Sequence, residues 1–346
     1  HPEELERFLE VFNYTIIPYS GKWTVIEPRQ GERNLAPLDA YLAWCRENDI
    51  EVEFHFVSGY EPPWLRDLPR AEQQAHLLRH ASDLIDRYAG QIRLWQIVNE
   101  RRLQNLSPAV FELFRQRHPG ALLGVSHCAR FFTDREGPRR EQDLWRGWDS
   151  VTQLQRAGAE VDYFGIHAHR PFGAWWDPRT IYEVLDEYER RGMRVRITEA
   201  GISRRGRIEG SVVQGEWNDD LQAEYLVQFM KVLFSHPNVD AVNFWGFGPR
   251  TWQPHIGILD ARYQPLPAFE ALRQLVQEEW RTRVTLTTAR DGRAAFTGFH
   301  GDYLLHIRTP DGQEHQLPFT LAPGAPPLQS LTLPASAPAT ATASHP

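Results

Sequence analysis

Two glutamates follow directly on short apolar runs that have the composition of buried β-strands. Glu100 closes the run 92–99, and Glu199 closes the run 193–198. Helix-like segments flank both runs, so we expect them to be parallel strands of an α/β protein. Carboxylates at the carboxyl ends of such strands lie where these folds carry out their chemistry. Two carboxylates on one sheet are the catalytic groups that most glycoside hydrolases use to cleave a glycosidic bond.

Strand-like runs alternate with helix-like segments along the first 280 residues. This alternation predicts an α/β fold, a (β/α)8 barrel of the TIM type, with an open parallel sheet as the alternative. A closed barrel needs eight strands and only seven runs are found, so we expect the first strand to be missing from this chain. An exposed gap would then separate the first and last runs. The strand-like runs are 14–18, 51–57, 92–98, 121–126, 161–166, 195–198 and 241–244, and the helix-like segments are 3–11, 38–48, 71–88, 108–117, 142–157, 181–191, 221–234 and 268–279.

The pattern changes after residue 279. Short runs at 282–287, 293–296, 303–308 and 315–319 predict strands separated by turn-forming sequences. We therefore expect three parts: a catalytic barrel over residues 1–280, a small antiparallel β appendage packed on it over 281–321, and a disordered tail over 322–346. The tail is rich in Pro, Ala, Ser and Thr, and we expect no chemistry there.

Composition excludes several classes of function. The 346 residues are 41% hydrophobic, which suffices for a large core, and the net charge of −7 gives no electrostatic reason to propose a nucleic acid or an anionic membrane as partner. No stretch reaches the ~20 apolar residues of a membrane span. Cys45 and Cys128 lie far apart and are expected to be buried thiols. The 12 tryptophans suit a carbohydrate site, because sugar rings stack on aromatic faces.

The sequence Trp-Gln-Ile-Val-Asn-Glu at 95–100 resembles the acid/base motif of glycoside hydrolase family 10, the β-1,4-xylanase family. Ile-Thr-Glu at 197–199 resembles that family's nucleophile strand. Further segments resemble the family in the same order, over roughly residues 9–320, and many members carry a similar β appendage. The resemblance implies a retaining hydrolase that is secreted or periplasmic and needs no cofactor. The further segments are 21–31 for the second strand, 164–169 for the sixth, and 243–246, 252 and 257–268 for the eighth strand and its loop.

The chain departs from the family pattern at positions that contact sugar. The family's third strand normally ends in His-Thr-Leu-Val-Trp-His, whereas residues 55–59 read His-Phe-Val-Ser-Gly and keep only His55 of that set. His167 stands where the family usually has Gln, and Tyr19 stands where it has Asn. The segment after Glu100 is shortened. We therefore expect the catalytic chemistry to carry over better than the specificity for xylan.

The resemblance assigns a role to each glutamate. Glu100 would be the general acid/base, which requires a raised pKa from partial burial and a neighbouring carboxylate. Glu199 would be the nucleophile, which must stay ionised, and His169 and Lys22 are candidates for stabilising its charge. The alternative for Glu100 is an ordinary helix-capping glutamate or one in a salt bridge, since Arg101 and Arg102 follow directly. The alternative for Glu199 is a strand-end glutamate paired with Arg196 or Arg204.

Other polar and aromatic residues of the same segments are expected to bind the sugar. Asn99 would hold the 2-hydroxyl, and His167 and His169 share one strand face and would contact sugar or Glu199. We expect no metal at these histidines, because the sequence shows neither a third ligand nor outer contacts. Lys22 lies in an apolar strand-like segment, where its ammonium group needs a polar partner. The predicted substrate-binding residues are Lys22, His55, Asn99, His167, His169, Trp245 and Trp252, and further candidates for outer subsites are Tyr60, Trp64, Trp175 and Trp176.

The leading hypothesis is an endo-β-1,4-xylanase-like hydrolase that uses a two-glutamate double displacement. A hydrolase of the same fold that acts on another glycan, such as a bacterial exopolysaccharide or a glycoconjugate, is the first alternative. A catalytically silent carbohydrate-binding barrel is the second, and the presence of both Glu100 and Glu199 argues against it. All three place these two residues across one mouth of the barrel.

Overall fold

The computed structural model describes residues 1–100, 107–127, 147–169, 174–209, 213–253, 255–326 and 328–333. The chain divides into two compact units, His1–Gln274 and Leu275–Pro346. Arg101, Arg102, Cys128 and the start of the predicted helix 142–157 lie outside the described residues. Among the described helices, none combines the length and the apolar character that crossing a bilayer requires.

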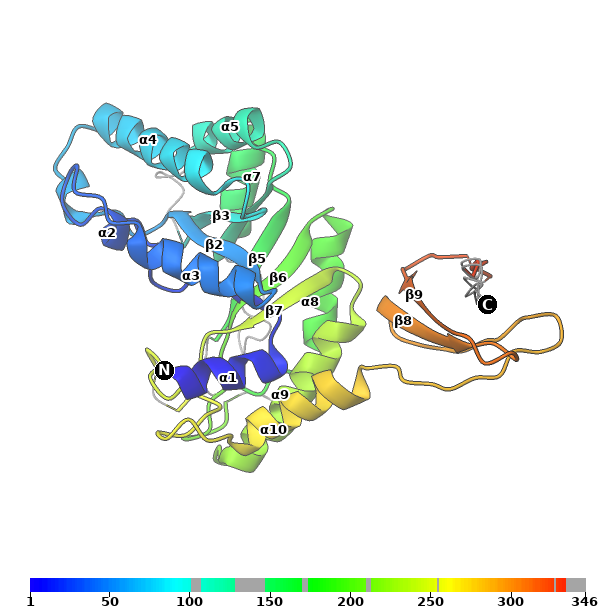
Figure 1. Ribbon diagram of the computed structural model, residues 1–346. Helices are drawn as coiled ribbons and strands as arrows, with labels where there is room; N and C mark the ends of the chain where they lie inside the picture. Colours follow the sequence, from blue (N-terminus) through cyan, green and yellow to red (C-terminus); the bar gives the residue numbers. More distant parts are fainter. Residues whose placement is uncertain are drawn as a thin grey trace, which may run out of the picture. The chain divides into compact units, whose positions relative to one another are not determined.

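Within the described residues of the first unit, seven parallel strands form the sheet, and they pair in the order of the sequence. The sheet curves into a nearly closed barrel that the helices surround (Figure 1). The prediction of a TIM-type barrel with seven strands in this chain is confirmed. The strands are β1 (Tyr14–Ile16), β2 (Glu51–Ser58), β3 (Leu94–Asn99), β4 (Leu122–His127), β5 (Tyr163–Ala168), β6 (Arg194–Ala200) and β7 (Val239–Phe244).

Helices connect successive strands, as parallel pairing requires. The predicted helix that precedes the first strand is present, and one short helix that the sequence did not predict, α2, follows β1. Side chains cap α8 and α9: Asp177 accepts from the backbone N–H of Arg179, and Asn218 accepts from that of Leu221. The helices are α1 (Pro2–Val11), α2 (Trp23–Ile26), α3 (Ala36–Glu47), α4 (Arg70–Tyr88), α5 (Pro108–Arg117), α7 (Trp148–Arg156), α8 (Pro178–Arg190), α9 (Asp219–Ser235) and α10 (Pro267–Gln274), with the 3₁₀ turn η1 (Pro63–Leu65).

A polar network fills part of the barrel interior. The Glu53 carboxylate accepts hydrogen bonds from Tyr14 (2.5 Å) and Tyr163 (2.9 Å), and Arg196 Nε lies 3.0 Å from Glu53 Oε2. These four residues come from β1, β2, β5 and β6, strands on opposite sides of the sheet order, so their contact shows that the sheet closes around them. Arg196 also lies 3.2 Å from Asp240 through Nη1. Its partners are thus Glu53 and Asp240, and the alternative in which Arg196 pairs with Glu199 is excluded.

Aromatic side chains pack between the two edge strands, β1 and β7. The ring centroids of Phe12, before β1, and Phe244, in β7, lie 5.9 Å apart, and Phe247 lies 5.2 Å from Phe12. Phe8 of α1 contacts Phe247 as well, at 5.9 Å. Within the described part of the chain, no strand ladder joins β1 to β7. The predicted gap in hydrogen bonding is present, and half-buried phenylalanines bridge it.

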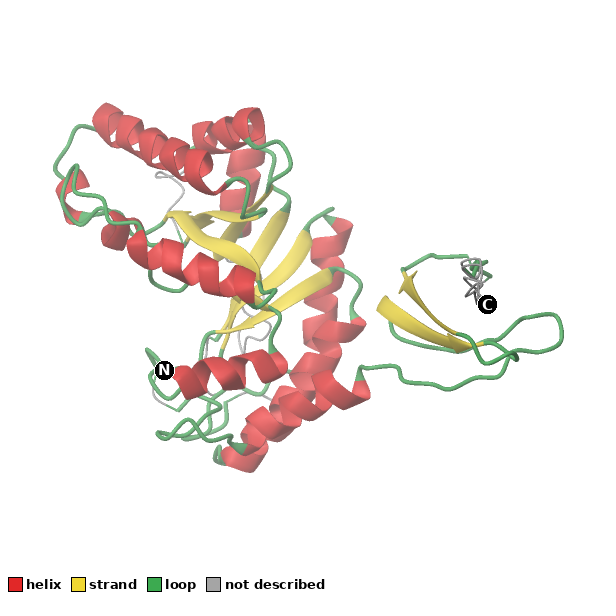
Figure 2. Cartoon of the chain, in the orientation of Figure 1, coloured by secondary structure: helices red, strands yellow, loops and turns green. Residues whose placement is uncertain are grey.

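The second unit begins with a π-helical turn, η3 (Leu275–Glu279), and contains an antiparallel pair, β8 (Gly301–Arg308) and β9 (Glu314–Leu321) (Figure 2). The strands predicted at 282–287 and 293–296 are wrong. Both runs have strand-like composition, but neither has a partner ladder, and the Thr282 hydroxyl instead contacts the backbone N–H of Phe299. Residues 322–326 and 328–333 form no helix or strand, while 327 and 334–346 lie outside the described residues.

Candidate active site

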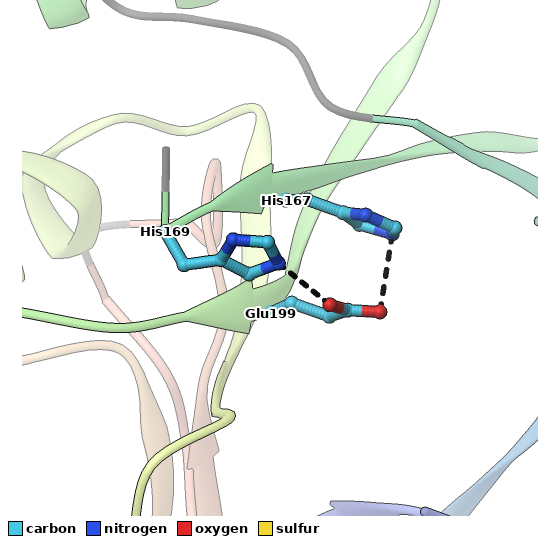
Figure 3. Close-up of side chains that lie close together, drawn as sticks. All are labelled: His167, His169 and Glu199. Carbon is cyan, nitrogen blue, oxygen red and sulfur yellow. Dashed lines mark hydrogen bonds and ion pairs between the residues drawn. The ribbon is translucent and has the colours of Figure 1, made fainter. Parts of the chain in front are cut away.

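The polar residues at the carboxyl ends of β2, β3, β5 and β6 come together in one site. His167 pairs directly with Glu199 in the register of β5 and β6, and His55 pairs with Gln96 in that of β2 and β3. Because all these strands run parallel, their carboxyl ends meet at one mouth of the barrel. Figure 3 shows His167 and His169 turned toward Glu199 from the neighbouring strand.

Three imidazoles surround the carboxylate of Glu199, which is only 6% exposed. His169 Nε2 lies 2.8 Å from Oε2, while His167 Nε2 and His55 Nε2 lie 3.4 Å and 3.7 Å from Oε1. Burial alone raises the pKa of Glu199, but the neighbouring imidazoles, chiefly those of His167 and His169, outweigh it and hold that pKa below its ordinary value. Glu199 is therefore ionised at neutral pH, the state in which a carboxylate can act as a nucleophile.

Glu100 stands at the same mouth in a more exposed position. Its side chain is 27% exposed, its Oε2 accepts a hydrogen bond from the Tyr60 hydroxyl at 3.3 Å, and His167 Nδ1 lies 3.2 Å from its Oε1. The backbone φ of Glu100 is +49°, a conformation uncommon outside glycine and concentrated at functional sites. One imidazole, that of His167, thus contacts both carboxylates, and the structure brings Glu100 and Glu199 together as expected.

A chain of buried amides supports the imidazole of His55. His55 Nδ1 lies 2.8 Å from Gln96 Oε1, and Gln96 Nε2 donates to Asn99 Oδ1 at 2.9 Å. Burial lowers the pKa of His55 to about 4, although Glu199 opposes this shift, so the ring is neutral at physiological pH. The sequence analysis missed Gln96. The available signal was a polar residue in the middle of an otherwise apolar strand.

The two predicted tryptophans lie beside the histidines. The ring centroid of Trp245 is 5.3 Å from that of His55, and the ring of Trp252 is 5.2 Å from that of His169 and 46% exposed. Lys22 follows β1 and precedes α2, so its predicted place within a strand is wrong; the strand ends at Ile16. Its charge still contributes to lowering the pKa of His55. All seven predicted substrate-binding residues therefore lie at this mouth, and their roles stay predictions.

The candidates for outer subsites divide into two groups. Tyr60 is 55% exposed and reaches Glu100, as a residue at the mouth should. Trp64 instead donates to the backbone oxygen of Glu27. Trp175 and Trp176 are 2% and 1% exposed and pack on α9 through Tyr225, so the prediction that they form exposed platforms is wrong. Their sequence position beyond a strand end could not show that a further loop and helix cover them.

The fold and the site define the class: a (β/α) barrel that carries a buried and a half-exposed glutamate at the carboxyl ends of its strands, in contact with one imidazole. The profile of the family described as "Glycosyl hydrolase family 10" matches residues 3–125 and 139–275. The chain belongs to this family, which confirms the resemblance seen in the sequence.

Relatives with assigned names include plant and bacterial proteins. Endo-1,4-beta-xylanase 2 of Arabidopsis thaliana is 25% identical over 88% of this chain and 28% of its own length, and endo-1,4-beta-xylanase B of Thermotoga neapolitana is 22% identical over 81% and 86%. Anti-sigma-I factor RsgI6 of Acetivibrio thermocellus is 24% identical over 92% of this chain and 41% of its own length. The chain thus spans less than half the length of several relatives that it matches.

Solved structures share the fold. Xylanase 10B of Thermotoga petrophila, solved in complex with xylobiose, superposes with a TM-score of 0.63 at 18% identity, covering 80% of this chain and 89% of that one. A psychrophilic family 10 endo-beta-1,4-xylanase gives a TM-score of 0.62 at 21% identity, with coverage of 79% and 92%. At such identities the likeness establishes the barrel and leaves substrate and mechanism to the site itself.

Proposed function

We propose that this chain is a retaining β-glycoside hydrolase that cleaves β-1,4-linked polysaccharide of the xylan type. One observation carries the proposal: His167 contacts a buried, ionised Glu199 and a more exposed Glu100 at once. Two carboxyl groups so placed flank a space in which a single glycosidic bond can be attacked and protonated. Because such polysaccharides lie mostly outside cells, the proposal includes an extracellular or periplasmic place of action.

In the first step, Glu199 attacks the anomeric carbon while Glu100 protonates the glycosidic oxygen that leaves. The carbon–oxygen bond to the leaving sugar breaks, and a glycosyl ester forms on Glu199. In the second step, the Glu100 carboxylate removes a proton from water, which attacks the same carbon and releases Glu199. Water is the second substrate, and Glu100 gives up one proton in the first step and regains one from water in the second, while Glu199 only forms and releases the ester.

The contacts of His167 suit the protonation states of the first step. With its proton on Nε2, a neutral His167 turns that N–H toward the ionised Glu199, 3.4 Å away, and Nδ1 accepts from the protonated carboxyl of Glu100. A single tautomer therefore supports an acid at residue 100 and a carboxylate at residue 199. Asn99, held by Gln96, and the rings of Trp245 and Trp252 would position the sugar beside this pair.

The test is a panel of β-linked polysaccharides, with the anomeric configuration of the first product followed by NMR. Release of β-configured reducing ends from xylan supports the proposal. Release of the α anomer as first product would show inversion and exclude a glycosyl ester on Glu199. An inactive protein that binds xylan tightly would select the silent carbohydrate-binding barrel.

A second candidate is hydrolysis of a different β-linked glycan by the same residues. It is favoured by the end of β2, where the Ser58 hydroxyl contacts Glu61 at 3.4 Å and Gly59 follows, so no aromatic or imidazole side chain stands at either position. His167, which stands where the family usually has Gln, also alters the side chains expected to contact the sugar. Activity on another polymer with none on xylan would select this candidate.

A further inference from the structure

The histidines around Glu199 also match the donor set of a divalent transition metal. One ligand atom from each of His167, His169 and Glu199 can be chosen so that all three lie within 4.8 Å of one another, and all three residues are buried (Figure 3). His55 Nε2 stands 3.7 Å from the same carboxylate. Zinc takes His and Glu ligands at ~2.0–2.1 Å, which places tetrahedral ligand atoms roughly 3.3 Å apart. His169 Nε2 lies 2.8 Å from Glu199 Oε2 and His167 Nε2 lies 3.4 Å from Oε1, so each imidazole nitrogen has one carboxylate oxygen near that spacing.

The outer contacts of two imidazoles are those that metal-bound histidines make. A histidine that binds metal through one ring nitrogen generally uses the other to contact a carboxylate or carbonyl oxygen. His167 Nδ1 meets the Glu100 carboxylate at 3.2 Å, and His55 Nδ1 meets the Gln96 amide oxygen at 2.8 Å. The sequence alone gave neither a third ligand nor these outer contacts, and the structure supplies both.

The orientation of Gln96 fixes which nitrogen of His55 faces inward without a proton. Gln96 Nε2 donates to Asn99 Oδ1, so its Oε1 must accept from His55 Nδ1–H. In the neutral ring, Nε2 then turns a lone pair toward the Glu199 carboxylate. A lone pair that faces a carboxylate oxygen is stabilised by a cation, or by the hydroxyl proton of a bound sugar, placed between them. Metal and substrate therefore compete for the same space.

We propose that His167, His169 and Glu199, with His55 beside them, bind one Zn²⁺ ion, and that this ion inhibits the enzyme by engaging its nucleophile. Imidazole and carboxylate ligands favour Zn²⁺ over the hard cation Mg²⁺, which prefers oxygen ligands and water. Binding follows from the geometry of the site alone. The inhibitory effect rests on the hydrolase function proposed above.

Metal binding is tested directly by titrating chelator-treated protein with ZnCl₂ in a calorimeter. The expected result is one Zn²⁺ per chain, no binding of Mg²⁺, and affinity at least 100-fold lower in His167→Gln and in Glu199→Gln. Circular dichroism and thermal melting establish that both variants are folded. A wild-type protein that takes up no Zn²⁺, or a folded His167→Gln variant with unchanged affinity, overturns the proposal.

A surface cluster on α8 and at the end of α9 provides the matched control. Asp186, Glu189 and His236 also have ligand atoms within 4.8 Å of one another, but both carboxylates are exposed. Asp186→Asn/Glu189→Gln is expected to keep wild-type Zn²⁺ affinity and wild-type hydrolysis. Loss of binding in this double variant would place the ion at the surface and refute the assignment. Cobalt substitution adds a spectroscopic readout: Co²⁺ at the proposed site gives visible absorption that His167→Gln abolishes.

Inhibition is measured with whichever glycan the enzyme hydrolyses. Zn²⁺ is expected to raise KM without lowering kcat, and addition of EDTA is expected to reverse the effect. If Zn²⁺ binds at the site while no glycan is hydrolysed, the proposed function fails and the metal site stands. If glycan is hydrolysed and Zn²⁺ neither binds nor inhibits, the metal site alone fails.

Discussion

The guanidinium group of Arg196 lies 3.0 Å from the carboxylate of Glu53 inside the barrel. Glu53 precedes His55 by two residues on β2, and Arg196 precedes Glu199 by three residues on β6. Both side chains are buried, and burial raises the pKa of Glu53 while Arg196 opposes the shift. Removing one partner of a buried pair leaves an uncompensated charge. We expect Arg196→Met to lower the free energy of unfolding by about 3–5 kcal/mol, measured by urea denaturation.

The exposed pair between Arg93 and Glu51 is the control. Its atoms lie 3.5 Å apart and its side chains are 63% and 50% exposed, so Arg93→Met should cost no more than about 1 kcal/mol. Arg196→Met/Glu53→Gln should recover part of the loss, because it leaves no unpaired charge in the barrel interior; Asp240, the other partner of Arg196, is 35% exposed to solvent. Equal destabilisation by Arg196→Met and Arg93→Met would contradict this account.

Gly124 makes room for the tyrosine that holds Glu53. A Cβ added at Gly124 would lie 2.1 Å from Cζ of the buried Tyr163 ring. Gly124→Ala must therefore displace this ring and its hydroxyl. We expect it to lower the free energy of unfolding by about 1–3 kcal/mol. At Gly120 an added Cβ meets nothing within 4 Å, so Gly120→Ala should be neutral or slightly stabilising. Comparable thermal melting of the two variants would show that the ring has space to move.

His80 of α4 makes stability depend on pH. Its ring is buried and stacked on Trp23 with centroids 4.3 Å apart, and burial together with the charges of Arg33 and Arg79 holds its pKa well below 6.5. The folded protein keeps this ring neutral, whereas the unfolded chain takes up a proton below about pH 6.5. Stability must therefore fall as the pH falls below that value, by up to about 1.4 kcal/mol per pH unit.

Replacing His80 should remove its contribution to the dependence of the free energy of unfolding on pH. We expect His80→Phe, which keeps a ring against Trp23, to lose less stability than the wild type between pH 6.5 and 5, when urea denaturation is followed at each pH. His55 contributes a slope of the same sign to both proteins, so their difference isolates His80. Parallel curves for the two proteins would show that His80 does not carry the effect.

The barrel could be predicted from sequence because its strands are short apolar runs buried on both faces. The runs expected at 92–98 and 195–198 became Leu94–Asn99 and Arg194–Ala200, errors of one or two residues at each end. The runs at 282–287 and 293–296 have similar composition, yet they form no strands. A strand forms only where a neighbouring strand pairs with it. Which segments become neighbours depends on the whole fold and cannot be seen in local composition.

In the candidate site, too, some residues could be predicted from the sequence and others could not. Strand ends located Glu100, Glu199 and His167, since parallel strands bring their carboxyl ends to one mouth. The place of Gln96 between His55 and Asn99 depends on which strand faces point inward at one level of the barrel, and this was not visible. The burial of Trp175 was missed for a related reason: what covers a loop aromatic comes from distant segments.

The last prediction separates the two proposed glutamate roles. Glu199→Ala should lose hydrolysis of every substrate by at least about 10³-fold, because it removes the carboxylate that forms the ester. Glu100→Ala should lose as much on polysaccharide, but an aryl glycoside with an acidic leaving group needs no protonation to depart. For that substrate we expect a burst of released phenol followed by slow turnover, with mass spectrometry locating the trapped sugar on Glu199. A Glu199→Ala enzyme that gives the burst, or a sugar found on Glu100, would reverse the assignment.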